Sequence, residues 1–379
     1  MNSHVRAKTL NQLLPVQCAA GDISVARIQL DSRKVAPGDL FIAIPGHSVD
    51  GREFIFDALK KGASSVLAES SGFAEDRRAE FPANVVWIEA VNRLMGQLAD
   101  RFFDAPSREL RIFAVTGTNG KTTVSHLLAR VCDFLDETAA TVGTLGYGHP
   151  DHLIPLANTT PDVVSLHGIL RTLRDQGCSV VTMEASSHGL DQGRLDEVRI
   201  STVIATNITR DHLDYHHTME AYFQAKARIA SWPGLRNLIL NLDDPLVSRM
   251  AKMAQAGVRV VGFSLHGDSK AEVSLVGCEY YPQGMLLNIR VGQQDYQLNS
   301  RLMGEFNIAN ILAVTAALWV EGFSLDAVFA ALSRVGPVLG RMECLPQLNI
   351  KLPVVVVDYA HTPDALEQVL KSLRKHCVN

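Results

Sequence analysis

The sequence predicts an α/β protein in which a small N-terminal α/β domain precedes a larger domain with a mostly parallel sheet. Three observations support this prediction. The chain has 379 residues, more than one ordinary hydrophobic core holds. Along its middle, apolar runs of strand length alternate with segments of helical periodicity, which is typical of a parallel sheet covered by helices. Between one such run and one such helix stands "TGTNGKTT", which is similar to a phosphate-binding loop, or P-loop.

The first region, residues 1–106, is predicted to form the small domain. Apolar runs at 38–46 ("GDLFIAIPG") and 63–69 ("ASSVLAE") have the length of strands. The stretch 52–63 ("REFIFDALKKGA") has the pattern of a helix. We therefore expect a compact α/β unit here.

The second region, residues 107–339, is predicted to form the central P-loop domain. A helix over 122–137 follows the glycine-rich loop, and a second apolar helix is expected over 307–323. Alternating apolar residues over 271–281 and 285–292 predict short antiparallel strands. The strands expected to run parallel lie at 110–117, 178–185, 198–208 and 235–244.

The third region, residues 340–379, holds one predicted strand at 353–360 ("PVVVVDYA") and one predicted helix at 362–377. One strand and one helix are too few for a core of their own. We therefore expect an incomplete, loosely held C-terminal domain.

Composition excludes several classes of function. The net charge of −4 and the pI of about 6.4 argue against nucleic acid as a partner. Six scattered cysteines without C-x-x-C spacing favour reduced thiols and a cytoplasmic location. The N-terminus has no apolar run typical of a signal peptide, and no window predicts a membrane span. We expect a monomer.

The loop supplies what a phosphate site needs, namely backbone N–H groups, a helix N-terminus and a cation. Glycines permit tight turns, Lys121 can reach the outer phosphates, and the Thr122 hydroxyl can hold Mg²⁺. The consensus places its first glycine at Val115, so this loop is a shortened form. The alternative is a Gly-Asn turn with a chance lysine. The predicted ATP-binding segment comprises Gly117, Thr118, Asn119, Gly120, Lys121, Thr122 and Thr123.

Eight further stretches occur in a fixed order along the chain. They are "LDSRKVAPGDLFIAIPGHSVDG", "NTTPD", "MEASSHGLDQGR", "TNITRDHLDYH", "YFQAKARIA", "LMGEFNIANILA", "GRME" and "VVVDYAHTPDAL". Together with the loop they resemble the Mur ligase family over nearly the whole chain. The resemblance implies three domains, the first binding a uridine nucleotide and the third Rossmann-like.

The resemblance also implies a reaction, the ATP-dependent ligation of an amino acid in peptidoglycan precursor synthesis. The γ-phosphate of ATP passes to a carboxylate, and an amine attacks the acyl-phosphate to give an amide and phosphate. The branch that these stretches resemble uses UDP-N-acetylmuramoyl-L-alanyl-D-glutamate as the acceptor. The added diamino acid is meso-diaminopimelate or L-lysine.

Three side chains are implied as Mg²⁺ ligands besides Thr122. Glu184 closes an apolar run, and a carboxylate at the carboxyl end of a strand lies beside the P-loop in such sheets. The resemblance adds His212 and Lys226, the latter carboxylated by CO₂ to N6-carboxylysine, whose carbamate oxygens suit a hard cation. From the residues alone, Glu184 could be a surface acid, His212 a structural histidine and Lys226 a solvated lysine. The implied catalytic residues are Lys121, Glu184, His212 and Lys226.

The remaining implied contacts, all polar residues except Leu30, concern two ligands, ATP and the nucleotide-sugar dipeptide. Asn307 and Asn310 are spaced to share a helical face, which the family uses near adenine. Arg341 and Asp358 are implied near the phosphates and ribose of ATP. Plain turns are the alternative for "NTT" and "SSHG". The implied contacts to the nucleotide-sugar dipeptide are Leu30, Ser32, His47, Asn158, Thr159, Thr160, Ser186, Gln192 and Arg194.

The family's amino-acid selecting signature, D-N-P-R or D-N-P-A, does not occur in these residues. We therefore expect this chain alone not to complete the ligation efficiently. Two alternatives stay open, a non-catalytic protein that binds ATP and a nucleotide sugar, and a relative of folylpolyglutamate synthase. The stretch "LDSRKVAPGDLF" disfavours the second alternative, because it resembles the uridine-nucleotide-binding domain of the ligases.

Overall fold

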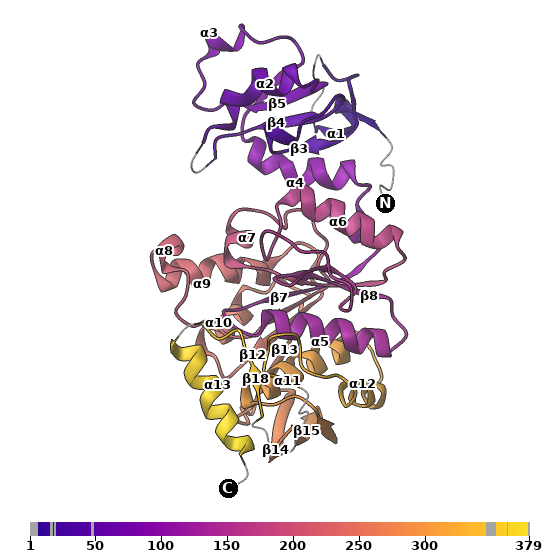
Figure 1. The fold of residues 1–379 in the computed structure, drawn as a ribbon, viewed down its shortest axis with the longest axis vertical. Helices are drawn as coiled ribbons and strands as arrows, with labels where there is room; N and C mark the ends of the chain where they lie inside the picture. Colours follow the sequence, from indigo (N-terminus) through magenta and orange to yellow (C-terminus); the bar gives the residue numbers. More distant parts are fainter. Residues whose placement is uncertain are drawn as a thin grey trace. The chain divides into compact units, whose positions relative to one another are not determined.

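The computed structural model describes residues 7–15, 18, 20–46, 49–345, 354–361 and 363–377. The chain forms two compact units (Figure 1). The first comprises Met1–Glu109, Pro161–Gln176 and Gln192–Val198, and the second comprises Leu110–Thr160, Gly177–Asp191 and Arg199–Asn379. Three segments of the predicted central domain, 107–109, 161–176 and 192–198, belong to the first unit. The third region belongs to the second unit, and its standing as a separate domain remains a prediction.

The first unit is built on a parallel sheet of order β3-β4-β5-β6. Its inner strands fall within the two predicted apolar runs, and the predicted helix is a 3₁₀ turn (Gly51–Phe54) continued by α2 (Ile55–Lys60). Side chains alternate between the faces, so Ile42 enters one core cluster while Phe41 enters another. The strands are β3 (Ile28–Gln29), β4 (Leu40–Ala43), β5 (Ser65–Glu69) and β6 (Val85–Ile88).

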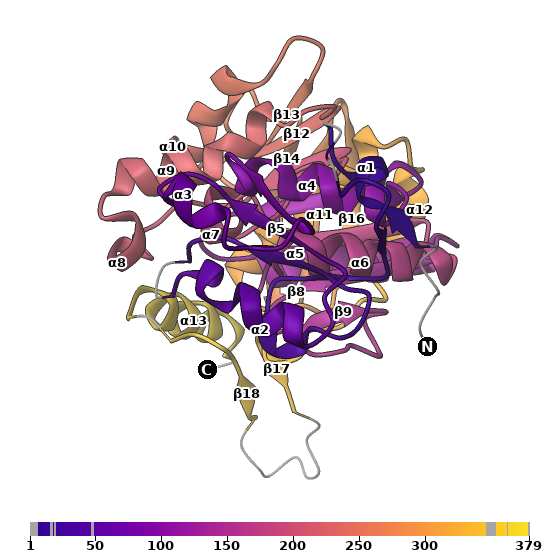
Figure 2. The same cartoon turned by 90° about the horizontal axis from the view of Figure 1, so that it is seen from above.

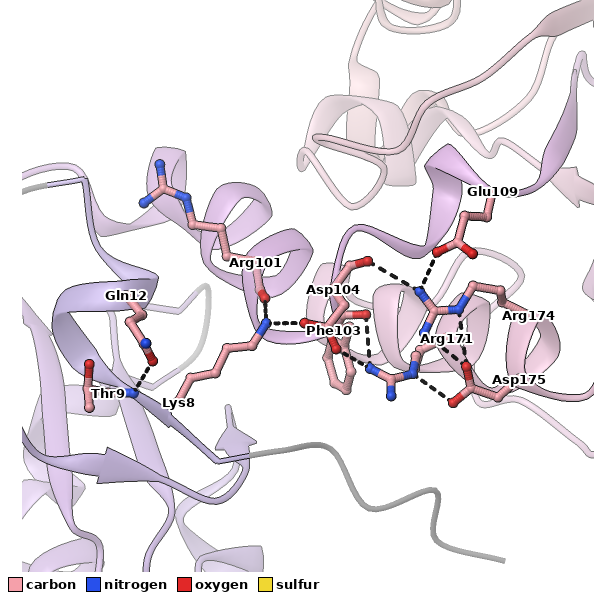
Figure 3. A network of polar contacts seen from close by, with 10 residues as sticks. All are labelled: Lys8, Thr9, Gln12, Arg101, Phe103, Asp104, Glu109, Arg171, Arg174 and Asp175. Carbon is pink, nitrogen blue, oxygen red and sulfur yellow. Dashed lines mark hydrogen bonds and ion pairs between the residues drawn. The ribbon is translucent and has the colours of Figure 1, made fainter.

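A polar network ties the distant segment 161–176 to this unit (Figure 3). The Asp104 carboxylate, after helix α4 (Val91–Phe102), accepts hydrogen bonds from Lys8 and from Arg171 of helix α6 (Val163–Asp175), each at 2.5 Å. Arg174 of α6 donates to the Glu109 carboxylate at 2.9 Å. Val163 and Val164 of α6 also pack in the core of this unit, whereas partly exposed ion pairs contribute little to stability.

The second unit contains a sheet of ten strands within the described residues, in the order β16-β15-β14-β13-β12-β11-β7-β10-β8-β9. Strands β14 to β8 along this order pair in parallel, and the two ends of the sheet are antiparallel. The predictions of a mostly parallel sheet and of antiparallel strands over 271–281 and 285–292 are thereby confirmed. The strands are β7 (Arg111–Thr116), β8 (Ala139–Gly143), β9 (Gly146–Gly148), β10 (Val180–Glu184), β11 (Thr202–Ala205), β12 (Asn237–Asn241), β13 (Arg259–Ser264), β14 (Val273–Tyr281), β15 (Gly284–Val291) and β16 (Gln294–Ser300).

Helices α5 (Lys121–Phe134) and α11 (Glu305–Val320) pack with this sheet, and Figure 1 shows α5 running along one of its faces. They contribute Leu127, Leu128 and Ile311 to its largest core cluster. Helix α7 (Ser187–Asp191) follows β10, α8 (Leu213–His216) and α9 (Met219–Ala227) follow β11, α10 (Pro245–Arg249) follows β12, and α12 (Leu325–Leu332) follows α11. None of the helices in the described ranges combines the length and hydrophobicity that crossing a membrane requires.

The C-terminal segment differs from its prediction. The expected strand over 353–360 is reduced to β18 (Val356–Val357), which pairs antiparallel with β17 (Glu343–Cys344), as Figure 2 shows. Helix α13 (Pro363–His376) is not loosely held, because Val369 packs with Met303 and Met342 in a small core. The Gly304 N–H also donates to His376 Nε2 at 2.9 Å.

We expect Glu321→Ala to destabilise the second unit by about 2–4 kcal/mol, since it leaves buried partners unsatisfied. The Glu321 carboxylate, 4 % exposed, accepts hydrogen bonds from Thr202 at 2.5 Å, Asn237 at 3.0 Å and Arg236 at 2.9 Å. Urea unfolding measures the change. The control is Glu220→Ala, which removes an exposed pair and should stay within about 0.5 kcal/mol. Equal effects of the two substitutions would contradict a stabilising role for the Glu321 network.

Candidate active site

The glycine-rich loop occupies the carboxyl edge of the sheet, after the central strand β7. Val115 is a buried strand residue, paired with Glu184 of β10 and Ile204 of β11. The turn therefore begins two residues later than in the longer consensus. Gly117 (φ +145°) and Gly120 (φ +87°) adopt conformations that L side chains rarely enter, and a Cβ at Gly117 would lie 2.0 Å from Thr206 Oγ1. The two glycines thus allow the tight turns that a loop shorter than the consensus requires.

Lys121 lies in the first turn of α5 and folds back over the loop. Its Nζ donates to the carbonyl oxygens of Gly117 at 2.9 Å and Thr118 at 2.8 Å. Burial lowers the pKa of Lys121, and the carboxylates of Glu184 and Asp211 oppose that shift. The ammonium group is therefore held among carbonyl oxygens, where an anion could compete for it.

Glu184 is the last residue of strand β10, and three hydrogen bonds from two threonines hold its carboxylate. Its carboxylate accepts hydrogen bonds from the Thr144 N–H at 2.8 Å, the Thr144 hydroxyl at 3.1 Å and the Thr122 hydroxyl at 3.1 Å. A Cβ at Gly143 would lie 2.2 Å from Glu184 Oε1, so this glycine leaves room for the carboxylate. The reading of Glu184 as a surface acid is wrong, because its exposure is 1 %.

Lys226 is almost fully buried, with 1 % exposure, although it stands near the end of an ordinary helix, α9. Its Nζ donates to the Gly117 carbonyl at 2.7 Å and lies 4.7 Å from the centroid of the Tyr222 ring. Burial, together with the nearby Lys121 cation, holds the pKa of Lys226 well below its usual value. The reading of Lys226 as a solvated lysine is therefore wrong, and the two lysines share one carbonyl acceptor.

His212 precedes α8 with φ +51° and is exposed. Its Nε2 lies 3.5 Å from a carboxylate oxygen of Asp211, and its ring centroid lies 4.9 Å from that of His188 and 6.2 Å from that of Tyr222. Across the part of the chain that the structure describes, no three His, Cys, Asp or Glu side chains cluster as a metal site. Oxygen donors near the loop include the Glu184 carboxylate and the Thr122 hydroxyl.

The predicted ATP contacts from α11 and the C-terminal segment approach the same loop. Asn310 Nδ2 donates to Asn307 Oδ1 at 2.9 Å, and a Cβ at Gly120 would meet Asn310 Oδ1 at 2.7 Å. The Arg341 guanidinium lies 3.4 Å from the Thr122 hydroxyl. Asp358 accepts from the backbone N–H of residue 342 at 2.8 Å, so it braces the turn that carries Arg341.

The predicted nucleotide-sugar contacts are divided between the units. Leu30 and Ser32 lie in the first unit, directly after β3, and His47 lies outside the described residues. Gln192 and Arg194 also belong to the first unit, where the side-chain amide oxygen of Gln192 accepts a hydrogen bond from the Arg194 guanidinium at 2.7 Å. Asn158, Thr159, Thr160 and Ser186 belong to the second unit.

The second-unit members of this set lie close to Glu184. The Thr160 hydroxyl donates to the Glu184 carbonyl at 2.8 Å and accepts from the Ser186 N–H at 3.1 Å. The Thr159 hydroxyl lies 3.1 Å from that of Thr144, which in turn bonds the Glu184 carboxylate. Their role as contacts to the nucleotide sugar stays a prediction.

The residues that hold Glu184 and the phosphate loop in place are not among the predicted site residues. Thr144 follows β8 and fixes Glu184, while Thr206 and Asn207 follow β11 and contact the loop. The sequence carries a signal for them, since Thr144 and Thr206 each directly follow an apolar strand and Asn207 comes next. Strand ends that are adjacent in the order β11-β7-β10-β8 bring them together.

The fold and the site define a P-loop α/β protein with a lysine, a cradled carboxylate and an arginine at one anion-binding edge. A model of the Mur ligase middle domain matches residues 115–318, and one described as the Mur ligase family catalytic domain matches residues 24–103. The chain belongs to the Mur ligase family, whose members are ATP-dependent amide ligases.

Curated relatives are similar along most of their length. The UDP-N-acetylmuramoyl-L-alanyl-D-glutamate--2,6-diaminopimelate ligase of Ectopseudomonas mendocina is 43% identical over 97% of this chain and 74% of its own length. The ligase of the same name from Pseudomonas aeruginosa is 42% identical over the same shares. A solved structure of a ligase of that name superposes with a TM-score of 0.84 at 33% identity, covering 99% of this chain and 75% of that one.

Proposed function

We propose that this chain takes part in the ATP-dependent ligation of meso-diaminopimelate to UDP-N-acetylmuramoyl-L-alanyl-D-glutamate, a step of peptidoglycan precursor synthesis. The observation that carries the proposal is the similarity, over 97% of the chain, to ligases that bear these substrates in their names. Those names favour diaminopimelate over L-lysine as the added amino acid. They give no support to a pterin substrate or to a non-catalytic role.

The phosphates of ATP would bind the N-terminus of α5, between Lys121 and Arg341. The N–H groups of Gly120, Lys121 and Thr122 stand at the helix end, where orphan donors and the helix dipole favour an anion. Asn307 and Asn310 would contact the adenine from α11, and Asp358 would keep Arg341 directed at the phosphates. Two cations at one end of the phosphate chain neutralise the charge that develops during transfer.

The residues present fit a hard cation such as Mg²⁺. The Glu184 carboxylate and the Thr122 hydroxyl are oxygen donors 3.1 Å apart, as a hard cation prefers. Bound Mg²⁺ would neutralise phosphate charge. His212 and a carbamate on Lys226 complete the proposed ligand set, and the neutral amine that a lowered pKa provides is the form that reacts with CO₂.

The nucleotide sugar would bind through Leu30, Ser32 and His47 at its uridine end. Hydroxyl and amide groups suit the muramoyl-peptide end, where Thr160 and Ser186 stand beside the proposed metal ligand Glu184. This neighbourhood would bring the acceptor carboxylate close to the γ-phosphate. The further residues proposed for that end are Asn158, Thr159, Gln192 and Arg194.

We expect UDP-N-acetylmuramoyl-L-alanyl-D-glutamate to raise the melting temperature of the chain. A ligand at 100 times its dissociation constant adds about 2.7 kcal/mol to stability. UDP should compete with it, since the proposed uridine contacts lie in the first unit. Thermal unfolding with each ligand measures the effect, and N-acetylglucosamine, which lacks the uridine diphosphate and the peptide, is the control. The absence of any shift at millimolar concentration would overturn the proposed substrate.

A further inference from the structure

The segment that follows strand β11, residues 206–209, holds the phosphate loop through hydrogen bonds; we call this segment and its bonds the clasp. The Thr118 N–H donates to the Asn207 carbonyl at 2.7 Å, and the Thr206 hydroxyl donates to the Asn119 carbonyl at 2.6 Å. The Thr118 hydroxyl accepts from the Thr209 N–H at 3.0 Å. The loop is therefore held by a neighbouring strand end as well as by its own glycines.

The Asn207 side chain has a special place in this clasp. Its Oδ1 accepts from the Asn119 N–H at 2.9 Å, and its Nδ2 donates to the Asn119 carbonyl at 3.1 Å. One amide thus satisfies both backbone groups of a single loop residue, as a neighbouring strand would. Among the side chains, only the amides of Asn and Gln hold a donor and an acceptor side by side in one plane.

The clasp also decides which N–H groups are left for a phosphate. The N–H groups of Thr118 and Asn119 already donate to Asn207. Neither group can bind an anion while it keeps that hydrogen bond. The donors that remain are those of Gly120 and the first turn of α5, which helix geometry leaves without partners. Gly120 joins the clasped residues to that turn with φ +87°.

We infer that Asn207 is a positioning residue for ATP, which holds the Asn119 backbone so that the N–H groups from Gly120 onward face the phosphates. The inference rests on the proposed function, because it needs ATP to bind at this loop. Both polar atoms of the Asn207 amide bond the Asn119 backbone, so Asn207 acts through Asn119. The clasp supplies, from another strand, rigidity to a loop that is shorter than the consensus.

Isothermal titration of ATP with Mg²⁺ into Asn207→Ala tests the inference. We expect affinity for ATP to fall roughly 10–30-fold, as for the loss of two hydrogen bonds that maintain the binding conformation. Asn207→Asp keeps the shape but loses the donor and adds a negative charge, so it should bind ATP more weakly still. Affinity for the nucleotide-sugar dipeptide should change less than twofold in both variants.

Asn241→Ala is the matched control, because the Asn241 amide donates to the Thr206 carbonyl of the same segment at 2.8 Å without contacting the loop. It should leave ATP affinity within about twofold of wild type. Unchanged ATP affinity in both Asn207 variants would overturn the inference, and so would a parallel loss of melting temperature and of both ligands. A wild-type chain that fails to bind ATP would instead overturn the proposed function, and the inference with it.

Discussion

Replacement of Lys121 by alanine is expected to weaken ATP binding by about 100-fold or more. The ammonium group already lies among loop carbonyl oxygens, 2.9 Å from that of Gly117 and 2.8 Å from that of Thr118, so it can turn toward phosphate without leaving the loop. Each hydrogen bond to a charged group contributes about 1.5–3 kcal/mol, and 1.4 kcal/mol corresponds to tenfold in affinity. Isothermal titration with ATP and Mg²⁺ measures the loss.

Lys252→Ala serves as the control for Lys121→Ala, since Lys252 is an exposed lysine of the same unit. It should bind ATP as wild type does. The melting temperature of the Lys121 variant should change far less than its ATP affinity, which shows that the variant stays folded. Wild-type ATP affinity in Lys121→Ala would show that the loop is not the phosphate site.

Lys226 is expected to carry a carbamate when Mg²⁺ and CO₂ are present. Its amine nitrogen would bond to the carbon of CO₂ and release a proton, a step that only the neutral amine undergoes. Burial and the adjacent Lys121 lower the pKa of Lys226, so the neutral form is populated at a lower pH than for an exposed lysine. Carbon-13 NMR with labelled bicarbonate should show a carbamate signal that disappears in Lys226→Gln.

The signal should weaken as the pH falls through the lowered pKa of Lys226, because protonation consumes the reactive amine. Lys270→Gln, which replaces an exposed lysine, should leave the signal intact. If the signal persists in Lys226→Gln, or never forms in wild type, Lys226 is not carboxylated and drops out of the proposed metal ligands.

The same lowered pKa has a consequence for stability. Between the folded pKa of Lys226 and its unfolded value of about 10.4, the unfolded chain binds more protons, so stability rises with pH across that window. Replacement by methionine fills a similar volume and removes the desolvated amine. It should therefore raise the melting temperature without ligand and flatten the pH dependence, a gain in stability at the cost of function.

Local sequence was sufficient for much of this protein. Period-two and period-3.6 patterns predicted the central strands and helices, because side-chain spacing within one element records which face is buried. "TGTNGKTT" predicted the strand–loop–helix, and the apolar run before Glu184 predicted a carboxylate at a strand end. The spacing of Asn307 and Asn310 predicted their shared face, where they form a hydrogen bond.

Other features depended on which strands became neighbours. The burial of Lys226, the hold of Thr144 on Glu184 and the clasp of Asn207 on Asn119 join residues 40 to 109 positions apart. The assignment of 161–176 to the first unit likewise rests on long-range packing. Side-chain periodicity is a property of one segment, whereas these contacts follow from the strand order β11-β7-β10-β8, which collects four strand ends around one loop. The sequence by itself therefore determined the elements and the chemistry of the loop, and the tertiary structure decided which distant side chains share it.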